Sequence, residues 1–233
     1  MKKVGIMVFI AALVVGLAVA NIFSFGKSTS RLFNFSFNFK GVRGSGQMAS
    51  DTRNATGFKG VDVGGVFQVE ITAQKDFSVE VDADDNLLQY IKTDVRNGVL
   101  HIETERKISP SGPIRVRVSA PEIENLDVSG VANVTATNIK TDELVLDSSG
   151  ASKINISGEV GKFVVDVSGA TKIDAENLVV SDATVDASGA STVVLNVSGE
   201  LRADASGASK IAYSGTPTSV KKSTSGASRV SPK

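Results

Sequence analysis

The side chains of this sequence that could do chemistry recur in two columns on either side of a repeated glycine. An aspartate stands three positions before the glycine, and a polar or basic residue stands three positions after it. The aspartates are Asp127, Asp147, Asp166, Asp186 and Asp204, and the later residues are Asn133, Lys153, Lys172, Thr192, Lys210 and Arg229. We expect both columns to face water. We also expect exposed ion pairs between the aspartate and lysine of one repeat, each stabilising the fold by only ~0–1 kcal/mol.

Stacked carboxylates offer the hard oxygen ligands that calcium prefers. The calcium-binding repeat Gly-Gly-x-Gly-x-Asp is absent, however, and lysine fills the column beside the aspartates. The chain also has no cysteine, which excludes disulfides, thiolate zinc sites, thiol catalysis and a lipoprotein anchor. The sequence therefore predicts no metal site and no cofactor.

The sequence offers little for catalysis. The one histidine, His101, lies between Leu100 and Ile102 in an alternating segment, so it points away from them as a surface strand residue does. Carboxylate pairs are the remaining option, as in polysaccharide-cleaving β-helical enzymes. The candidates are Asp82, Asp84, Asp85, Glu122 and Glu124. They fall in expected turns where acidic residues face water, so we predict a chain without catalytic residues that is not an enzyme.

The polar columns are candidates for a binding surface, because small hydroxyl side chains between charged columns can offer hydrogen bonds to a partner. The candidate residues are Asp147, Ser149, Lys153, Asp166, Ser168, Thr171, Lys172, Asp186, Ser188, Asp204, Ser206 and Lys210. The 25 basic and 25 acidic residues cancel, so no overall field attracts nucleic acid or an anionic membrane. The expected partner is a glycan or a protein of the envelope or cell surface.

An internal repeat positions these columns. Its glycines are Gly130, Gly150, Gly169, Gly189, Gly207 and Gly226, with separations of 20, 19, 20, 18 and 19 residues. One repeat holds a strand "LVLDS", a turn at Ser149-Gly150, a strand "SKINI" and a second turn at Ser157-Gly158. About nineteen residues at ~3.3 Å each close a circuit of roughly 60 Å, which suits one coil of a β-solenoid. Because the coil length varies, whereas left-handed β-helices keep a strict hexapeptide, the sequence predicts an all-β, right-handed parallel β-helix.

Alternation along each coil assigns the interior of this β-helix. The inward residues are Leu144, Leu146, Ile154, Ile156, Phe163, Val165, Val167, Ile173, Ala175, Val185, Ala187, Val193, Leu195 and Val197. Before the repeat, between Phe58 and about Pro121, the segments "GVDVGGVFQVEIT", "FSVEVDA", "GVLHIETE" and "IRVRVSAP" predict half-buried strands. One helical turn is expected in "DDNLLQYIKTDV".

The first 25 residues indicate where in the cell the protein is located. Lys2 and Lys3 precede the apolar run Val4–Ala20, which ends in a small-x-small cleavage pattern. The uncharged segment 4–23 is also long enough, at ~1.5 Å rise per residue, to cross a membrane. Residues 1–25 are therefore a cleaved signal peptide or a retained signal anchor. Both predict export across the inner membrane, to the periplasm or cell surface, with membrane contact only through this segment if it is not cleaved.

Residues 26–48 are predicted to be a phenylalanine-rich strand and a linker. Phe33, Phe35, Phe37 and Phe39 alternate with amide and hydroxyl side chains, a strand pattern that could cap a sheet, lie at a membrane interface or pair with another subunit. The stretch Gly41–Gly46 indicates a short flexible joint. Residues 49–233 are predicted to form the β-helical domain, with the Ser-Gly-Ala coils at 126–230.

The segments "GFKGVDVGGVFQVEI", "VEVDADDNLLQYIKTDVRNGVLHIET" and "IRVRVSAPEIENLDVSGVANV", followed by serial "SGA(S/T)", resemble a known family. It is the head GIN domain of putative auto-transporter adhesins, and the resemblance covers roughly Ala49 to Arg229. It implies an exported envelope protein with a right-handed β-helical fold. Many members carry a lipoprotein cysteine after the signal, which this chain lacks.

Two functions from different classes follow. In the first, the long side of the solenoid binds a glycan or protein partner. In the second, the chain is a structural component that assembles through the ends of the solenoid. The last repeat replaces aspartate with Ser223 and brings Lys221, Lys222, Arg229 and Lys233, and basic residues on a sheet edge usually guard against pairing.

Overall fold

The structure is a computed structural model that describes residues 41–233. This part of the chain is all-β, as expected, and its one helical element is a short 3₁₀ turn, η1 (Leu88–Tyr90). None of the helical structure described is long and apolar enough to cross a membrane. The signal peptide or anchor predicted for residues 1–25 and the strand predicted around Phe33–Phe39 lie outside the described residues.

Short strands form the region before the repeat. They are β2 (Met48–Arg53), β3 (Gly60–Ala73), β4 (Ser78–Asp84), β5 (Ile91–Arg96), β6 (Val99–Thr104) and β8 (Arg115–Ala120). β4 pairs antiparallel with both β2 and β8, and β8 pairs in parallel with β3. β5 and β6 form a hairpin whose turn residues Asn97 and Gly98 have φ angles of 53° and 77°, the geometry that an Asn-Gly turn favours. The four predicted strands and the helical turn are confirmed.

The segment Gly41–Gly46 is not the flexible joint that its glycines indicated. β1 (Val42–Arg43) pairs in parallel with β7 (Ile108–Ser109), and the Gly44 N–H donates to the Ser109 carbonyl at 2.9 Å. The Gly46 N–H donates to Asp84 Oδ1 at 2.8 Å. These bonds hold the segment against the rest of the domain, and a Cβ on Gly44 would collide with the Asp84 carboxylate. Glycine at position 44 therefore allows the backbone to pack closely against Asp84.

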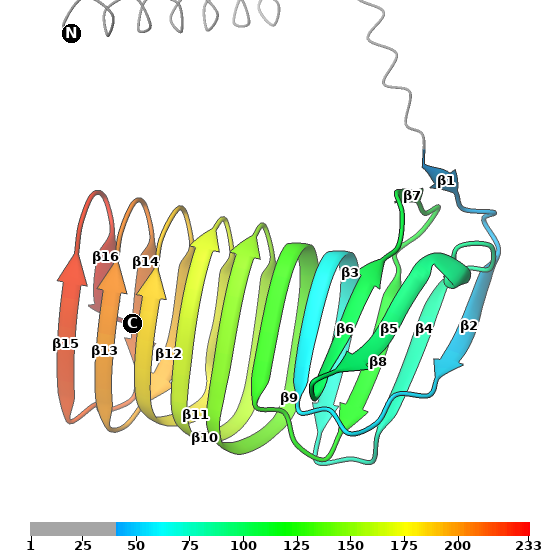
Figure 1. Cartoon of the computed structure of the whole chain (residues 1–233). Coiled ribbons are helices and arrows are strands. Elements are labelled where there is room, and N and C mark those ends of the chain that lie inside the picture. The colour runs from blue at the N-terminus through cyan, green and yellow to red at the C-terminus, as the bar shows by residue number, and fades with distance from the viewer. Residues whose placement is uncertain (1–40) are drawn as a thin grey trace, which may run out of the picture. The chain divides into compact units, whose positions relative to one another are not determined.

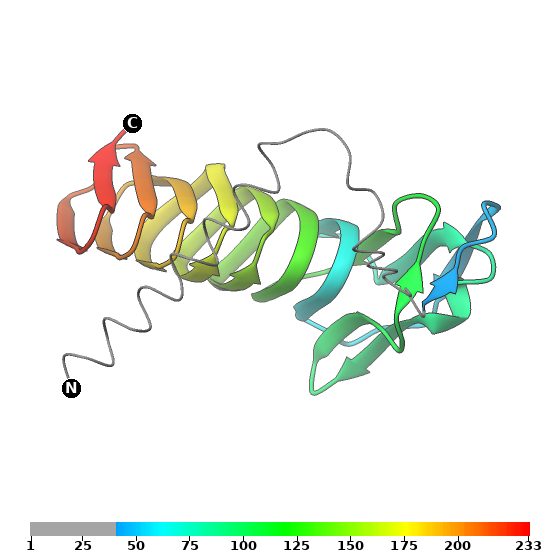
Figure 2. The same cartoon turned by 90° about the horizontal axis from the view of Figure 1, so that it is seen from above.

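The Ser-Gly-Ala repeats pair with one another in parallel. Their strands are β9 (Asn125–Gly150), β10 (Lys153–Gly169), β11 (Lys172–Ala187), β12 (Thr192–Val197), β13 (Glu200–Ala205), β14 (Lys210–Ser214), β15 (Ser219–Thr224) and β16 (Arg229–Pro232). Lys153 lies beside Asn133 on one side and Lys172 on the other, so each repeat contacts the equivalent residues of the next. Figures 1 and 2 show the repeats lying side by side in sequence order.

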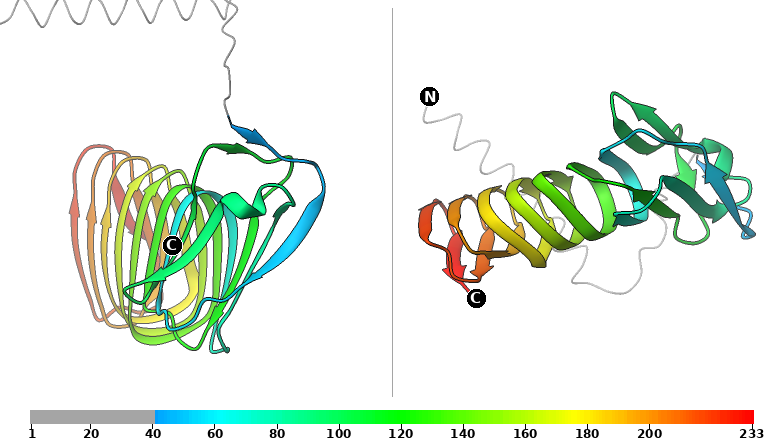
Figure 3. Two further views of the ribbon diagram at one scale, coloured as in Figure 1. Left: turned by 45° about the vertical axis from the view of Figure 1, so that its right-hand side comes forward. Right: turned by 90° about the horizontal axis from the view of Figure 1, so that it is seen from below.

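β3 belongs to the same series of parallel strands as the repeats, although it lies far from them in sequence. Gly65 stands beside Gly130, and the register continues without a shift from Gly60–Asn125 to Thr72–Thr137. The segment from β4 to β8 is thus an insertion between two strands that are neighbours in space (Figure 3). The 65-residue offset between the two glycines falls outside the period of about nineteen residues that reveals the other repeats.

The side chains that point inward from these parallel strands form an apolar core. All fourteen side chains predicted to point inward are buried, and Phe163, Leu146 and Ile154 are fully so. Alternation decides this, because successive side chains of a strand point to opposite faces. Further buried side chains from β3, β4, β6 and β8 belong to the same core cluster, so the insertion shares the interior of the repeats.

The glycine of each repeat packs directly on the glycine before it. An ideal Cβ on Gly169 would lie 2.4 Å from the Gly150 carbonyl oxygen, and one on Gly150 would lie 2.3 Å from that of Gly130. The second predicted turn differs from expectation, because β10 runs on through Ser157 and Gly158 with only a shift in register. Gly158 has a φ of 141° and stacks on Ile139 in the same way.

Candidate binding surface

The aspartate column is longer than the repeat pattern indicated. In register order it reads His101, Asp62, Asp127, Asp147, Asp166, Asp186, Asp204 and Ser223. We call this outward side the aspartate face. Asp62 was missed in the sequence because the insertion separates β3 from the repeats, although Asp62 stands three residues before Gly65, as the repeat pattern requires.

The end of the aspartate face that carries His101 is partly enclosed. Leu100 and Ile102 are buried, so His101 points to the opposite side as predicted, and its Nδ1 lies 2.7 Å from Asp62 Oδ2. Burial raises the pKa of Asp127, and the neighbouring carboxylates of Asp62 and Asp147 raise it further. A hollow of about 270 Å³ opens here, and no serine, threonine or cysteine lines it.

The second column begins in β3 as well. In register order it reads Gln68, Asn133, Lys153, Lys172, Thr192, Lys210 and Arg229. Two residues further along these strands, and therefore on the same side, Glu70, Thr135, Asn155 and Asp174 form another polar row. We call the side formed by these two rows the lysine face.

The ion pairs predicted between aspartate and lysine of one repeat do not form. No ion pair within residues 41–233 joins Asp147 to Lys153 or Asp166 to Lys172, and Asp204 Oδ2 pairs instead with Arg202 Nε at 3.3 Å. The aspartates lie on the strand before the glycine and the lysines on the strand after it. Because the chain changes direction at the glycine, the two columns occupy different faces.

The candidate surface residues fall into three groups. Asp147, Ser149, Lys153, Asp166, Ser168, Lys172, Asp186 and Lys210 are exposed, and Ser188, Asp204 and Ser206 are half-buried. Thr171 is buried, with 2% of its surface exposed, so its assignment to the surface is wrong.

Thr171 belongs to an inward row of hydroxyl side chains that the sequence analysis missed. Its members Ser152, Thr171, Ser191 and Ser209 are all buried. Since Lys172 points outward, alternation requires the residue before it to point inward. The hydroxyls accept this position because they form hydrogen bonds. Ser209 Oγ donates to the Ala187 carbonyl of the previous repeat at 3.0 Å, and Ser191 Oγ donates to the Ser188 carbonyl of its own repeat at 3.1 Å.

Of the acidic residues that we expected to face water in turns, Asp85 is exposed, whereas others make contacts that hold parts of the domain together. Asp84 is buried, with 1% exposed, and accepts hydrogen bonds from the N–H of Gly46 and from both the N–H and Oγ of Ser111. The Ser111 bonds lower the pKa of Asp84 despite its burial. Glu122 and Glu124 both pair with Lys59 Nζ at 2.8 Å. These contacts give the carboxylates structural roles.

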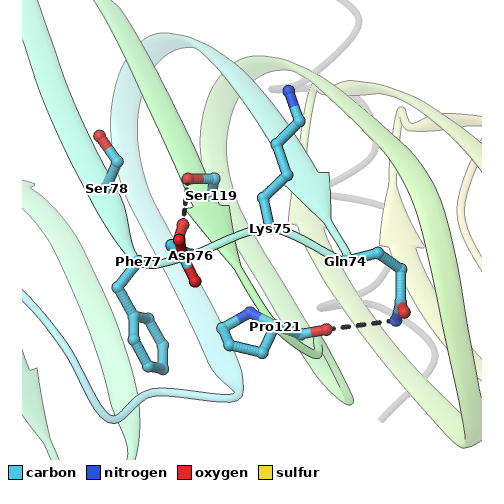
Figure 4. A pocket seen from close by; sticks show the side chains of 7 residues that line it. All are labelled: Gln74, Lys75, Asp76, Phe77, Ser78, Ser119 and Pro121. Carbon is cyan, nitrogen blue, oxygen red and sulfur yellow. Dashed lines mark hydrogen bonds between the residues drawn. The ribbon is translucent and has the colours of Figure 1, made fainter.

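A groove lies at the edge of the insertion. Its main part, about 710 Å³, lies where the β3–β4 loop meets the end of β8 (Figure 4). Gln74, Lys75, Asp76, Phe77, Ser119 and Pro121 line it. A smaller part of about 230 Å³ adjoins it, shares Lys75, Ser78 and Ser119, and extends to Glu70 on the lysine face. Sequence patterns give no sign of this groove, because its two sides are distant in the chain.

Across residues 41–233 no group of three or more histidine, cysteine, aspartate or glutamate side chains is arranged to hold a metal ion. The aspartates of the column stand one per repeat, so the spacing between parallel strands of successive repeats keeps their carboxylates about 4.8 Å apart. The two faces and the groove can therefore interact with a partner through hydrogen bonds and charged side chains.

Comparison with known proteins gives one family match. The family model described as "Putative auto-transporter adhesin, head GIN domain" matches residues 57–217. A search of curated proteins found no match.

Among solved structures, a "putative adhesin" from Bacteroides fragilis is similar with a TM-score of 0.68 and 18% identity, covering 83% of this chain and 100% of its own. A "putative lipid binding protein" from Parabacteroides distasonis has a TM-score of 0.54 and 18% identity, with coverage of 83% and 100%. A "putative adhesin" from Parabacteroides merdae has a TM-score of 0.53 and 17% identity, with coverage of 82% and 98%. At these identities the likeness concerns the fold alone.

Proposed function

The chain belongs to the head GIN domain family of putative auto-transporter adhesins, and from this premise we propose that it is an exported, non-enzymatic binding module of the cell envelope. In this proposal the lysine face and the aspartate face present their polar rows to a glycan or to a protein of the envelope. The printed names of the family and of two similar structures, each a "putative" adhesin, support a binding role.

The scaffold in this proposal is a right-handed parallel β-helix. The parallel register of equivalent residues in successive repeats supports it. The course of the chain in Figure 1 also supports it, since β13 and β15 run upward in front while the repeats advance to the left. A β-helix holds equivalent side chains of neighbouring coils about 4.8 Å apart. Such an array suits a partner whose polar groups also repeat.

One observation favours the lysine face as the binding surface. Lys153, Lys172 and Lys210 are exposed, and none of them is among the ion pairs of the described residues. By contrast, Lys162 and Lys92 on other parts of the surface pair with Glu143 and Glu105. Unpaired ammonium groups in a row can bind a partner without first losing an internal contact.

The experiment is a screen of the full chain, purified in mild detergent, against glycan and envelope-protein arrays. We expect binding that the double variant Lys153→Ser/Lys172→Ser weakens. The matched control is Lys92→Ser/Lys162→Ser, which removes the same charge elsewhere and should bind as the parent does. Loss of binding equal in both variants would show a general charge effect and refute the role of the lysine face. Absence of any bound component would remove the binding function.

Assembly through the ends of the row is the second candidate, and the last repeat disfavours it. Lys222 and Thr224 stand in register with the buried Ala203 and Ala205, so they occupy positions that are inward in the other repeats. A further strand stacked on β15 would have to cover the Lys222 ammonium group, which costs free energy unless it is paired. Light scattering of the full chain at high concentration tests this, and concentration-dependent growth would restore the assembly hypothesis.

A further inference from the structure

We propose that the groove between the β3–β4 loop and the end of β8 is a binding site for a neutral saccharide. The inference rests on the proposed binding function and assigns one ligand class to one site. The volume of the main part, about 710 Å³, falls in the range of small-molecule sites, roughly 300–1,000 Å³. It is large enough for a sugar ring with its hydration, and the adjoining part lengthens it for a second ring.

The groove combines an aromatic wall with polar groups. Phe77 and Pro121 supply its apolar surface (Figure 4). A sugar ring has C–H groups on its faces and hydroxyl groups around its edge, so it is recognised by an aromatic ring together with donors and acceptors. The Gln74 amide, the Lys75 ammonium group and the Asp76 carboxylate provide both kinds of polar group at the rim.

The aromatic wall is held from behind. The Phe77 ring is half-buried, and its centroid lies 5.1 Å from that of Phe58, with the two rings tilted by 58°. Phe58 is fully buried in the core. The ring is therefore positioned before a ligand arrives, which lowers the entropy cost of binding.

The loop that carries the polar groups is also fixed. The N–H groups of Gln74 and Lys75 donate to the carbonyls of Pro121 and Ala120, both at 3.2 Å, and Ser119 Oγ donates to the Asp76 carbonyl at 2.6 Å. Gln74 has a φ of 63°, a left-handed conformation uncommon for a residue other than glycine. Residues held in such conformations cluster at ligand-binding sites, where the surrounding contacts maintain the strain.

Two of the polar side chains are available to a ligand. Lys75 and Asp76 are exposed, and within residues 41–233 neither is among the side chains that form ion pairs. Their charges cancel. In the adjoining part, Arg117 pairs with Glu80 at 3.1 Å and with Asp82 at 2.7 Å, so its charge is already compensated. Glu70 and Glu80 also line the adjoining part, so the groove has no excess of positive charge, and a neutral ligand is favoured over an anionic one.

The groove opens onto the lysine face, which sets the direction in which a longer chain could continue. Glu70 lines the smaller part and stands in register with Thr135, which in turn stands beside Asn155. These carboxylate, hydroxyl and amide groups form a row of hydrogen-bonding partners beyond the groove. A second and third sugar residue can thus meet polar side chains of the repeats.

The test uses the full chain in mild detergent and three neutral trisaccharides, maltotriose, cellotriose and N-acetylated chitotriose, with ligand-observed NMR and titration calorimetry. We expect at least one to bind with a dissociation constant of about 1 mM or lower, typical of a shallow site that gives about 4 kcal/mol. Phe77→Leu keeps an apolar side chain against Phe58 and should weaken binding about tenfold by removing the aromatic wall. Asp76→Ala removes an exposed carboxylate with no structural role and should also weaken binding.

The matched control is Asp94→Ala, an exposed aspartate of β5 outside the groove, and it should bind as the parent does. Binding of none of the three trisaccharides at about 10 mM, well above the expected constant, would overturn the proposal. So would binding that survives both Phe77→Leu and Asp76→Ala. If the saccharide is lost from Lys153→Ser/Lys172→Ser but not from the groove variants, the lysine face binds it and only the groove assignment fails.

Discussion

Replacing Gly169 with alanine tests why the repeat carries glycine. Gly169 has a φ of +93°, a backbone conformation that other L-residues rarely adopt. An ideal Cβ at this position would also lie 2.4 Å from the carbonyl oxygen of Gly150 and 3.0 Å from its nitrogen. Both atoms belong to the backbone, so neither can rotate away, and Gly169→Ala must push two neighbouring repeats apart.

The cost of the backbone conformation and the cost of the steric contact can be estimated separately. A residue held in an unfavourable φ region costs about 1–3 kcal/mol. Forcing an extra carbon into a packed interior costs about 1–3 kcal/mol more. Gly169→Ala should therefore lower the free energy of unfolding by about 2–6 kcal/mol, a large share of the 5–15 kcal/mol that is usual for a folded domain.

Two other glycines allow the effects to be measured one at a time. Gly57 has a φ of +77° with no heavy atom within 4 Å of an ideal Cβ, so Gly57→Ala shows the conformational cost alone. Gly161 lies outside the left-handed region, but its Cβ would approach the Asp142 carbonyl oxygen to 2.7 Å. Gly161→Ala therefore shows the contact cost alone.

The assay is guanidinium unfolding of the full chain and its three variants, followed by far-ultraviolet circular dichroism and, in parallel, by proteolysis. Two probes are needed because repeat arrays can unfold in parts. We expect Gly169→Ala to lose more stability than either single-effect variant. A midpoint for Gly169→Ala equal to that of Gly57→Ala would refute the claim that stacked glycines hold neighbouring repeats at this distance.

Three further outcomes follow from the described contacts. Asp84→Asn should destabilise the domain at pH 7, and urea titrations should show the difference from the parent shrinking below pH 4. The reason is that hydrogen bonds from Ser111 and Gly46 hold the folded-state pKa of Asp84 below its ordinary 3.8, so its contribution is present above that pH and is lost in acid. Asp127→Asn should raise the melting temperature above that of the parent at pH 7 and leave it equal to that of the parent near pH 2. The reason is that the pKa of Asp127 is raised in the folded state, so its ionisation destabilises the fold as pH rises. A variant that melts at the same temperature as the parent at pH 7 would contradict this. Phe163→Ala should lower the free energy of unfolding by about 3–5 kcal/mol in guanidinium titrations, since the ring is fully buried in β10, and a loss below about 1 kcal/mol would contradict its place in the core.

The candidate binding surface could be predicted only in part. Alternation and the position of the glycine correctly placed the aspartates and lysines outward, because both are local properties of a strand. The same rule, applied to the residue before the outward Lys172, places Thr171 inward, so its assignment to the surface conflicts with the alternation. The groove had no such signal, since Asp76 and Ser119 meet through the pairing of β8 with both β3 and β4.

The sequence alone determined that residues 41–233 are all-β, which apolar side chains are buried in the repeats, and where the glycine of each repeat stands. These follow from a two-residue alternation and a period of about nineteen residues, both of which are written along the chain. Only the tertiary structure decided that β3 lies beside β9, that Asp84 is buried, that the two charged columns occupy separate faces, and that glycine packs on glycine. Each of these depends on the distance between atoms of different repeats or across the insertion, and no local pattern of side chains specifies such a distance.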